Sequence, residues 1–187
     1  LLGSEAVTSI AVDPANRKWL GTETDGVYLV SENGDRIINH FNVNNSPLFS
    51  NKIIDIEIHS ESGEVFISTG KGVISYKGFA TTPKENHQNV LVYPNPVEPN
   101  YNGLIGIKGL VQNANFKITD INGNLVFSSK ANGGQGVWDG TNSYGERVGS
   151  GVYLIFSANA LGTETNVAKI LFINNDWIYN RYSFKYN

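Results

Sequence analysis

Apolar and polar residues alternate in short runs along most of the chain, and Gly, Asn, Asp or Pro residues bound each run. Ile53-Ile54-Asp55-Ile56-Glu57-Ile58 is one such run. No stretch repeats its apolar residues every three or four positions over the length of a helix. Because a half-buried strand has a period of two and an amphipathic helix a period of about 3.6, the pattern predicts an all-β fold.

One pattern occurs twice in the first part of the chain, at an offset of 46 residues from Ile10 to Ile56. This offset is close to the ~40–50 residues of a β-propeller blade, which holds four strands. The first copy has four candidate strands and the second has three. We therefore expect residues 1–79 to form an incomplete propeller of about two blades. Since two blades cannot close a ring, we also expect the chain to be the C-terminal piece of a longer protein. The matched segments are Val7–Val12 with Ile53–Ile58, Trp19–Thr22 with Val65–Ser68, and Gly26–Tyr28 with Gly72–Ile74.

A second unit follows a polar stretch at residues 80–89, which we interpret as a linker. About seven strand-like runs lie within residues 90–174, and Asn122-Gly123 between two of them is a strong hairpin signal. In residues 136–154, a short strand with Trp138 leads into turns rich in Gly, Asn and Ser, as at the corner of a sandwich. The strand count and these turns predict an Ig-like antiparallel β-sandwich.

Composition excludes several classes of partner and site. The formal net charge of −3, with no run of Lys or Arg, argues against a nucleic-acid partner. The absence of cysteine excludes disulfides and thiolate metal sites. The apolar runs are far shorter than the ~20 residues of a membrane-spanning helix, so we expect no transmembrane segment.

Residues that often carry chemistry lack the spacing that chemistry requires. His40, His59 and His87 show no i, i+4 pair or other metal spacing, and we assign them surface or loop roles. Asp120–Asn124 begins like a calcium loop, but its Gly is fourth rather than sixth, which favours a hairpin turn. Gly149-Ser150-Gly151 has no helix behind it, unlike a nucleophile elbow. We therefore predict that the chain is not an enzyme and has no catalytic residues, no cofactor and no metal.

Two parts of the chain resemble known families. Residues 4–78 resemble the two-component regulator propeller repeat, on the motifs Ser50-Asn51-Lys52-Ile53, Lys18-Trp19-Leu20-Gly21-Thr22 and Lys71-Gly72-Val73-Ile74-Ser75-Tyr76. Residues 90–173 resemble the C-terminal domains of the type IX secretion system and the related Ig-like domain of flagellar hook-capping proteins. That resemblance is carried by Tyr93-Pro94-Asn95-Pro96, Ile118–Gly123, Trp138-Asp139-Gly140, Ser150–Leu154 and Ala168–Leu171.

Propeller repeats joined to such a terminal domain are similar to the PorZ-type surface proteins of type IX secretion. The resemblance implies export to the outer-membrane surface or the extracellular space. It implies a propeller that offers a platform for a ligand or partner, and a sandwich that serves as a sorting or docking module, read through strand edges and loops. The implied partners are secretion-system proteins, including a sortase, and anionic lipopolysaccharide.

The signature positions for sorting or partner binding are expected in the sandwich. Most of them shape the fold, and only Lys169 can act through its charge. These positions are Pro94, Asn95, Pro96, Gly151, Val152, Tyr153 and Lys169.

Residues 175–187 depart from the family pattern, because such domains normally end close to the Lys-containing last strand. This tail has five aromatic residues: Trp177, Tyr179, Tyr182, Phe184 and Tyr186. We interpret it as an extra edge strand that packs on the sandwich. A docking strand for a partner, or an altered terminus, is the alternative.

Two other functions stay open at this point. Similar propeller repeats occur in the sensory ectodomains of hybrid histidine kinases. The chain could also be an accessory module of a secreted polysaccharide-degrading enzyme, with the catalytic domain upstream.

Overall fold

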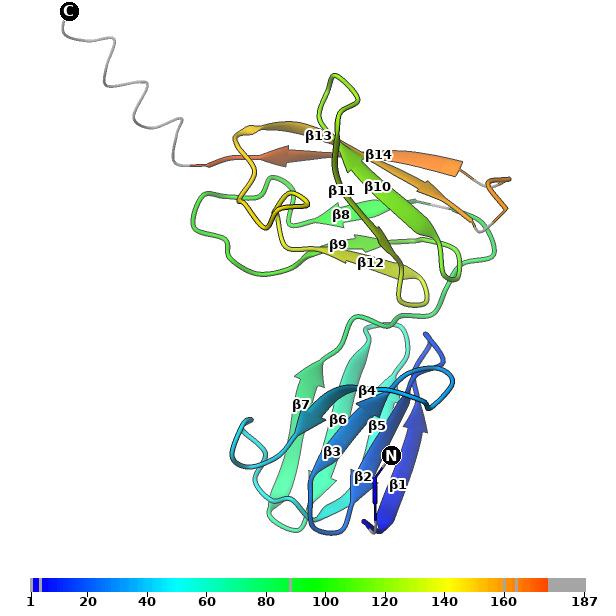
Figure 1. Cartoon of the computed structure of the whole chain (residues 1–187), viewed down its shortest axis with the longest axis vertical. Coiled ribbons are helices and arrows are strands. Elements are labelled where there is room, and N and C mark those ends of the chain that lie inside the picture. Colours follow the sequence, from blue (N-terminus) through cyan, green and yellow to red (C-terminus); the bar gives the residue numbers. More distant parts are fainter. Residues whose placement is uncertain (1, 4, 88, 160, 164, 175–187) are drawn as a thin grey trace, which may run out of the picture. The chain divides into compact units, whose positions relative to one another are not determined.

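The computed structural model confirms the all-β prediction; it describes residues 2–3, 5–87, 89–159, 161–163 and 165–174. Fourteen strands and no helix occur among these residues (Figure 1). None of the described segments is therefore a helix that could cross a membrane. The chain divides into two compact units, Leu1–Thr82 and Pro83–Asn187.

The first unit consists of two antiparallel sheets in which the strands follow chain order. One sheet holds β1 (Val7–Val12), β2 (Lys18–Thr22), β3 (Val27–Val30) and β4 (Ile37–Phe41). The other holds β5 (Ile53–His59), β6 (Glu64–Thr69) and β7 (Gly72–Lys77). The first strand of each sheet has a register shift at the equivalent place, between Val7 and Ser9 and between Ile53 and Asp55. The repeat in the sequence is thus matched in local geometry.

The two sheets of the first unit share one core around Trp19. Its indole, 1% exposed, stacks on the Phe41 ring with a centroid distance of 6.0 Å, and the Tyr76 ring lies 5.6 Å away. Gly21 permits the close approach of the sheets, because a Cβ at this position would lie 2.6 Å from Ile53 Cγ2. The Trp and the Gly of the repeated motif are therefore the residues that bring the two sheets together.

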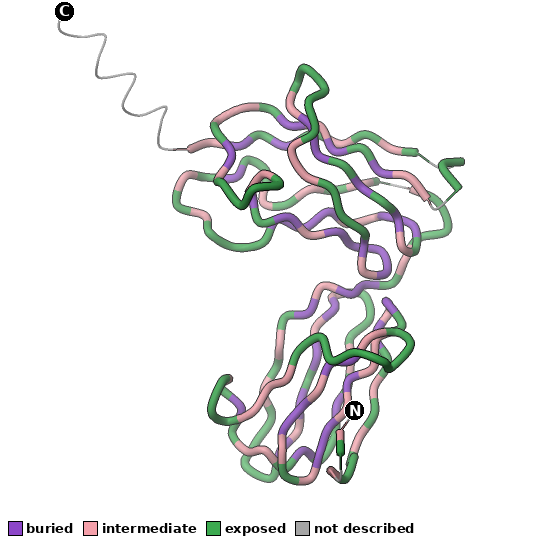
Figure 2. The backbone as a smooth tube through the Cα atoms, viewed as in Figure 1, coloured by how far each residue is buried: buried purple, intermediate pink, exposed green. Residues whose placement is uncertain are grey.

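The second unit also consists of two antiparallel sheets. The four-stranded sheet has the order β11 (Leu125–Lys130), β10 (Asn115–Thr119), β13 (Gly151–Ala158) and β14 (Thr165–Phe172). The three-stranded sheet has the order β12 (Gln135–Trp138), β9 (Ile105–Lys108) and β8 (Leu91–Tyr93). Figure 2 shows buried residues along strands of both units, such as β2, β9 and β10, whereas β1, β4, β7, β8 and β11 carry only partly buried or exposed residues.

The core of the second unit lies between its two sheets. Trp138 on β12 meets Tyr153 on β13 and Phe172 on β14, with ring centroids 5.8 Å apart in both pairs. Ile105 and Ile107 on β9 are fully buried against the same cluster. The alternating residues of β9, β10, β13 and β14 supply most of the remaining contacts. This packing fixes the strands that carry the signature positions.

Candidate functional site

Asn95 joins two motifs that lie far apart in the sequence. Its Nδ2 donates to the backbone oxygen of Lys169 at 3.0 Å, and its Oδ1 accepts from the backbone N–H of Leu171 at 3.0 Å. Asn95 stands between Pro94 and Pro96, and the peptide bonds before both prolines are cis. The short Pro-Asn-Pro segment therefore acts as a side-chain clamp on the backbone of β14.

Val97 extends this clamp. Its N–H donates to the Leu171 carbonyl at 2.8 Å, and its carbonyl accepts from the Ile173 N–H at 2.9 Å. Val97 and Phe172 form an isolated parallel bridge. The edge of β14 is thus hydrogen-bonded to the chain's own backbone and side chain from Lys169 to Ile173.

The Gly151-Val152-Tyr153 motif begins β13, which is paired with β14. Gly151 lies opposite Phe172, and Val152 lies opposite Leu171. Tyr153 points into the core, and its Oη donates to the Gly149 carbonyl at 2.9 Å. Burial of the ring raises the pKa of the Tyr153 hydroxyl, so it stays protonated and serves as a donor.

Lys169 lies opposite Leu154 on the face of β14 that points away from the core, and its side chain is exposed. All seven predicted signature residues therefore lie on β13, on β14 or on the segment that clamps β14. The side chains of Tyr153 and Asn95 hydrogen-bond to backbone groups, whereas the charged side chain of Lys169 is exposed. The fold thus brings together, around β14, three motifs that are far apart in the sequence.

The loop after Trp138 is organised by its own side chains. Trp138 Nε1 donates to the Thr141 carbonyl at 2.7 Å, and Asp139 Oδ1 accepts from the backbone N–H and the hydroxyl of Thr141.

Arg147 donates to the carbonyls of Asp139 and Tyr101, and its guanidinium lies 4.7 Å from the centre of the Phe172 ring. Sequence reasoning missed Arg147, because a single Arg in a polar turn gives no signal of a buried aromatic partner.

The Asp120 loop is a hairpin turn. Asp120 Oδ1 accepts from the backbone N–H groups of Asn122 and Asn124, and Oδ2 accepts from Asn124 Nδ2. These bonds, the one from the Asn124 side chain first, lower the pKa of the Asp120 carboxyl. The carboxylate thus satisfies turn donors and leaves little capacity for a cation.

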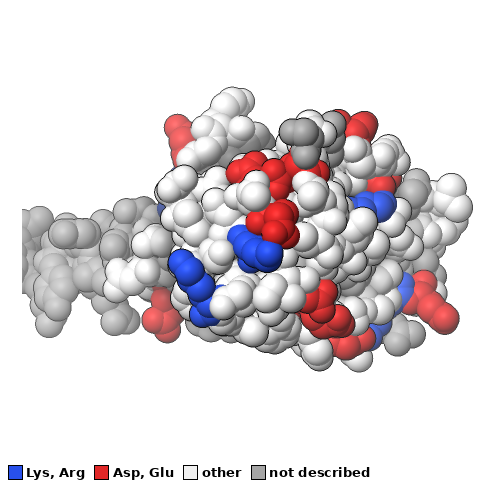
Figure 3. All heavy atoms as spheres, turned by 90° about the horizontal axis from the view of Figure 1, so that it is seen from below, with Lys and Arg blue, Asp and Glu red and all other residues white. Residues whose placement is uncertain are grey.

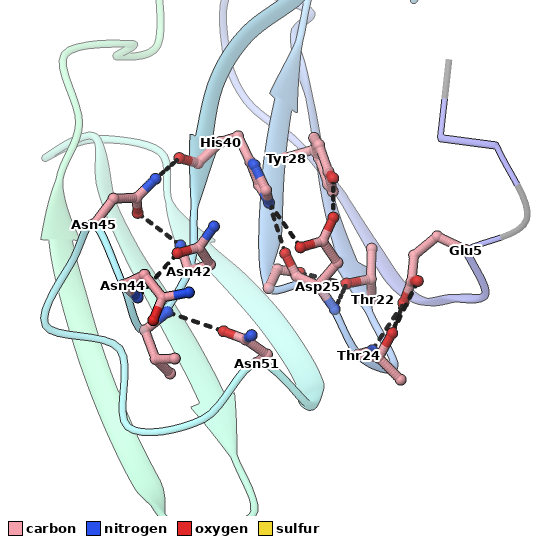
Figure 4. Close-up of polar contacts among 12 residues, drawn as sticks. Glu5, Thr22, Thr24, Asp25, Tyr28, His40, Asn42, Asn44, Asn45 and Asn51 are labelled. Atoms are coloured by element: carbon pink, nitrogen blue, oxygen red, sulfur yellow. Dashed lines mark hydrogen bonds and ion pairs between the residues drawn. The ribbon is translucent and has the colours of Figure 1, made fainter.

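A polar cluster of the first unit lies around the turn between β2 and β3, where β4 ends (Figure 4). The Tyr28 hydroxyl donates to Asp25, and this bond is the main reason that the pKa of Tyr28 is raised to about 12. The His40 ring stacks on Tyr28 with centroids 4.0 Å apart, and His40 Nε2 lies 2.6 Å from the Asp25 carbonyl oxygen. Nearby, both Glu5 carboxylate oxygens accept from Thr24. These groups bind one another and the turn between β2 and β3.

Figure 3 shows acidic and basic side chains mixed among uncharged ones on the face it presents. Among the described residues there is no group of three or more His, Asp or Glu side chains that could hold a metal ion. His59 Nδ1 lies 2.9 Å from the Ser62 hydroxyl in an exposed hairpin. The predicted aromatic edge strand at 175–187 lies outside the described residues.

Residues 91–172 match the family described as the secretion system C-terminal sorting domain. The chain is similar to PorZ, a surface component of the type IX secretion system of Porphyromonas gingivalis, with 32% identity and a TM-score of 0.62. This likeness covers 91% of the chain and 23% of PorZ, so the chain spans about a quarter of that protein.

Two further solved structures match the chain with TM-scores below 0.5. Latent PorU of P. gingivalis is 19% identical, with a TM-score of 0.36 and coverage of 59% of this chain and 12% of PorU. The extracellular domain of the putative one-component system BT4673 of B. thetaiotaomicron is 12% identical, with a TM-score of 0.32 and coverage of 96% and 26%. A comparison with curated protein sequences gives no match. Residues 91–172 therefore belong to the secretion system C-terminal sorting domain family, and the chain resembles PorZ along nearly all of its own length.

Proposed function

We propose that the chain is a non-enzymatic, cell-surface component of type IX secretion, in which the second unit is the sorting and docking module. The observation that carries this proposal is the convergence of the sorting-domain match with the geometry of β14. Seven signature residues from three separate motifs lie on or beside β13 and β14. The side chains of Asn95 and Tyr153 bond to backbone groups, and Lys169 lies on the exposed face.

The proposed mechanism is recognition of a rigid surface. The Asn95 side chain and the Val97 backbone occupy the edge of β14 between Lys169 and Ile173. A partner strand cannot add to that part of the edge without displacing them. We therefore propose that the secretion machinery reads the exposed face and the flanking loops of the sheet, and that Asn95 fixes the position of Lys169.

We propose further that the first unit is part of a β-propeller that offers a platform for a partner or ligand. The 46-residue offset, the equivalent register shifts and the shared core around Trp19 support this interpretation. The outer face of the β1–β4 sheet carries exposed Ile10 and Val12, and in a propeller such a face stacks on the next blade.

By resemblance, a sortase and lipopolysaccharide are the proposed partners. Lipopolysaccharide is anionic, whereas residues 1–82 hold 10 acidic and 6 basic residues. Of the two units, the second therefore suits such a ligand better. Co-purification of lipopolysaccharide from outer membranes with the whole chain, and its loss when Lys169 is replaced, is the corresponding test.

Surface delivery tests the main proposal. The whole chain, behind an added export signal, is expressed in a host with an active type IX system and in a strain without the secretion pore. We expect protease-accessible protein on intact cells of the first strain and periplasmic retention in the second. A chain that ends at Thr82 is the control and stays inside both. Equal surface exposure of both chains in both strains would overturn the proposal.

A further inference from the structure

On the outer face of the four-stranded sheet in the second unit, β13 and β14 carry a row of exposed apolar side chains. Cross-strand register puts Val152 beside Leu171, and Phe156 beside Val167. These four side chains are 40–53% exposed. Strands that face water on one side normally alternate apolar and polar residues, whereas strands that are apolar on both sides are typical of sheets covered on both faces. The residue pattern is thus typical of a sheet face that packs against another element or a partner.

The charges on this face have a single sign. Lys117 on β10 lies opposite Phe156 on β13, and Lys169 on β14 lies opposite Leu154 on β13. Both lysine side chains therefore point outward with the apolar row. Lys130, on the edge strand β11, lies opposite Asn115 on β10. None of the four strands contains Asp or Glu. A partner that complements this face has apolar side chains and negative charge.

The lysines flank the apolar row in a way that suits an extended segment. Val152, Leu154 and Phe156 follow one another at every second position of β13, with Lys117 on one neighbouring strand and Lys169 on the other. Lys117, Phe156 and Val167 also line a shallow hollow on this face. An extended chain laid along β13 meets apolar side chains at a two-residue spacing and an amine on either side.

We infer that this surface, the docking face (Lys117, Val152, Phe156, Val167, Lys169 and Leu171), binds an extended protein segment that alternates apolar and acidic side chains. The inference rests on the proposed docking role of the second unit and specifies its partner. The clamp on β14 favours contact with the face over strand addition at residues 169–173.

A synthetic peptide with alternating Glu and Leu or Val residues is the probe. Its charge-reversed twin has Lys in place of Glu, and vesicles of phosphatidylglycerol represent an anionic lipid surface. Binding to the whole chain is measured by fluorescence anisotropy and mapped by NMR shifts. We expect the Glu peptide to bind, the Lys peptide not to bind, and shifts to gather at Val152, Phe156 and Val167.

Two variants separate charge from apolar contact. In Lys117→Glu/Lys169→Glu, affinity for the Glu peptide is expected to fall by about tenfold or more, and the Lys peptide is expected to bind instead. Val167→Ser, at a 53% exposed side chain, is expected to weaken binding of the Glu peptide without unfolding the unit. Lys71→Glu/Lys84→Glu, which changes the net charge equally at exposed sites, is the matched control.

Three results would overturn the docking face. They are Glu-peptide binding that survives the Lys117→Glu/Lys169→Glu change, shifts that map elsewhere, and lysine-dependent binding of vesicles in preference to the peptide. The last would reassign the face to a lipid. Surface delivery is measured separately. Peptide binding without surface delivery of the wild-type chain would refute the proposed sorting function but not the proposed docking face.

Discussion

At the scale of single residues, a few polar side chains hold backbone that the strand ladders leave unpaired. Asp13, which is 4% exposed, accepts from the backbone N–H groups of Ala15 and Arg17 and from the side chains of Arg17 and Trp19. Asn95 does the same work for β14. Such residues stabilise a turn or an edge through the geometry of several bonds rather than through burial of apolar surface.

Asn95→Ala tests this role directly. The change removes one donor to Lys169 and one acceptor from Leu171, and two partly exposed bonds together contribute about 1–2 kcal/mol to the stability of the edge. We expect the Leu171 amide to exchange its hydrogen about five times faster or more, as measured by NMR. Asn95→Asp keeps the acceptor for Leu171 and should lose less protection. In Asn124→Ala, which affects only the Asp120 loop, exchange at Leu171 should be unchanged. Equal exchange at Leu171 in all of these proteins would refute the clamp.

At the scale of elements, alternation along the chain specifies strands well. The segment Val7–Val12 is strand β1, and the alternating run Ile53–Ile58 lies within β5 (Ile53–His59). A period of two tells which residues share a face of one strand, because successive side chains point to opposite sides. The period of two does not tell which other strand pairs with a given strand. The pairing of Lys117 with Phe156, and the bond from Asn95 to Lys169 across 74 residues, therefore could not be read from the sequence.

The turns that join the strands depend on glycine where the backbone adopts positive φ. Gly26, between β2 and β3, has φ of +82°, and a Cβ there would lie 2.1 Å from the Phe41 carbonyl oxygen. Gly34, between β3 and β4, has φ of +72°, and no atom lies within 4 Å of such a Cβ. The two glycines thus share a backbone conformation and differ in the space around them.

Alanine at these two positions separates strain from crowding. Gly34→Ala is expected to cost about 1 kcal/mol of unfolding free energy, for the φ value alone. Gly26→Ala adds a clash with main-chain atoms that cannot rotate away, and we expect a further loss of roughly 1–3 kcal/mol. Urea unfolding, followed by tryptophan fluorescence, measures both losses of unfolding free energy. Equal losses in the two variants would show that crowding at Gly26 is relieved by a small backbone shift.

At the scale of the whole molecule, each unit has a sheet face that lies outside its own core and carries exposed apolar side chains. In the second unit it is the docking face. In the first unit it is the outer face of the β1–β4 sheet, where Ile10 pairs with Leu20 and Val12 pairs with Lys18. Ile10 is 63% exposed and Val12 is 55% exposed, while Trp19 on the opposite side of the sheet is buried. An apolar face of this kind is stable in water only when a neighbour covers it or when copies of the chain associate through it.

Ile10→Thr/Val12→Thr tests whether the outer face of the β1–β4 sheet drives self-association of the chain. Threonine keeps the β-branched shape, so the strand should persist and the free energy of unfolding should change by less than about 1 kcal/mol. Removing these apolar side chains from an interface should weaken association about tenfold or more, because each buried side chain contributes ~1.5–3 kcal/mol. Sedimentation velocity over a concentration series measures the change. Ile121→Thr/Val43→Thr, at exposed loop positions that are 70% and 44% accessible, removes the same kinds of side chain and should associate like the wild type. If the test variant instead unfolds with a loss above about 2 kcal/mol, these residues pack within the unit and the stacking-face interpretation fails.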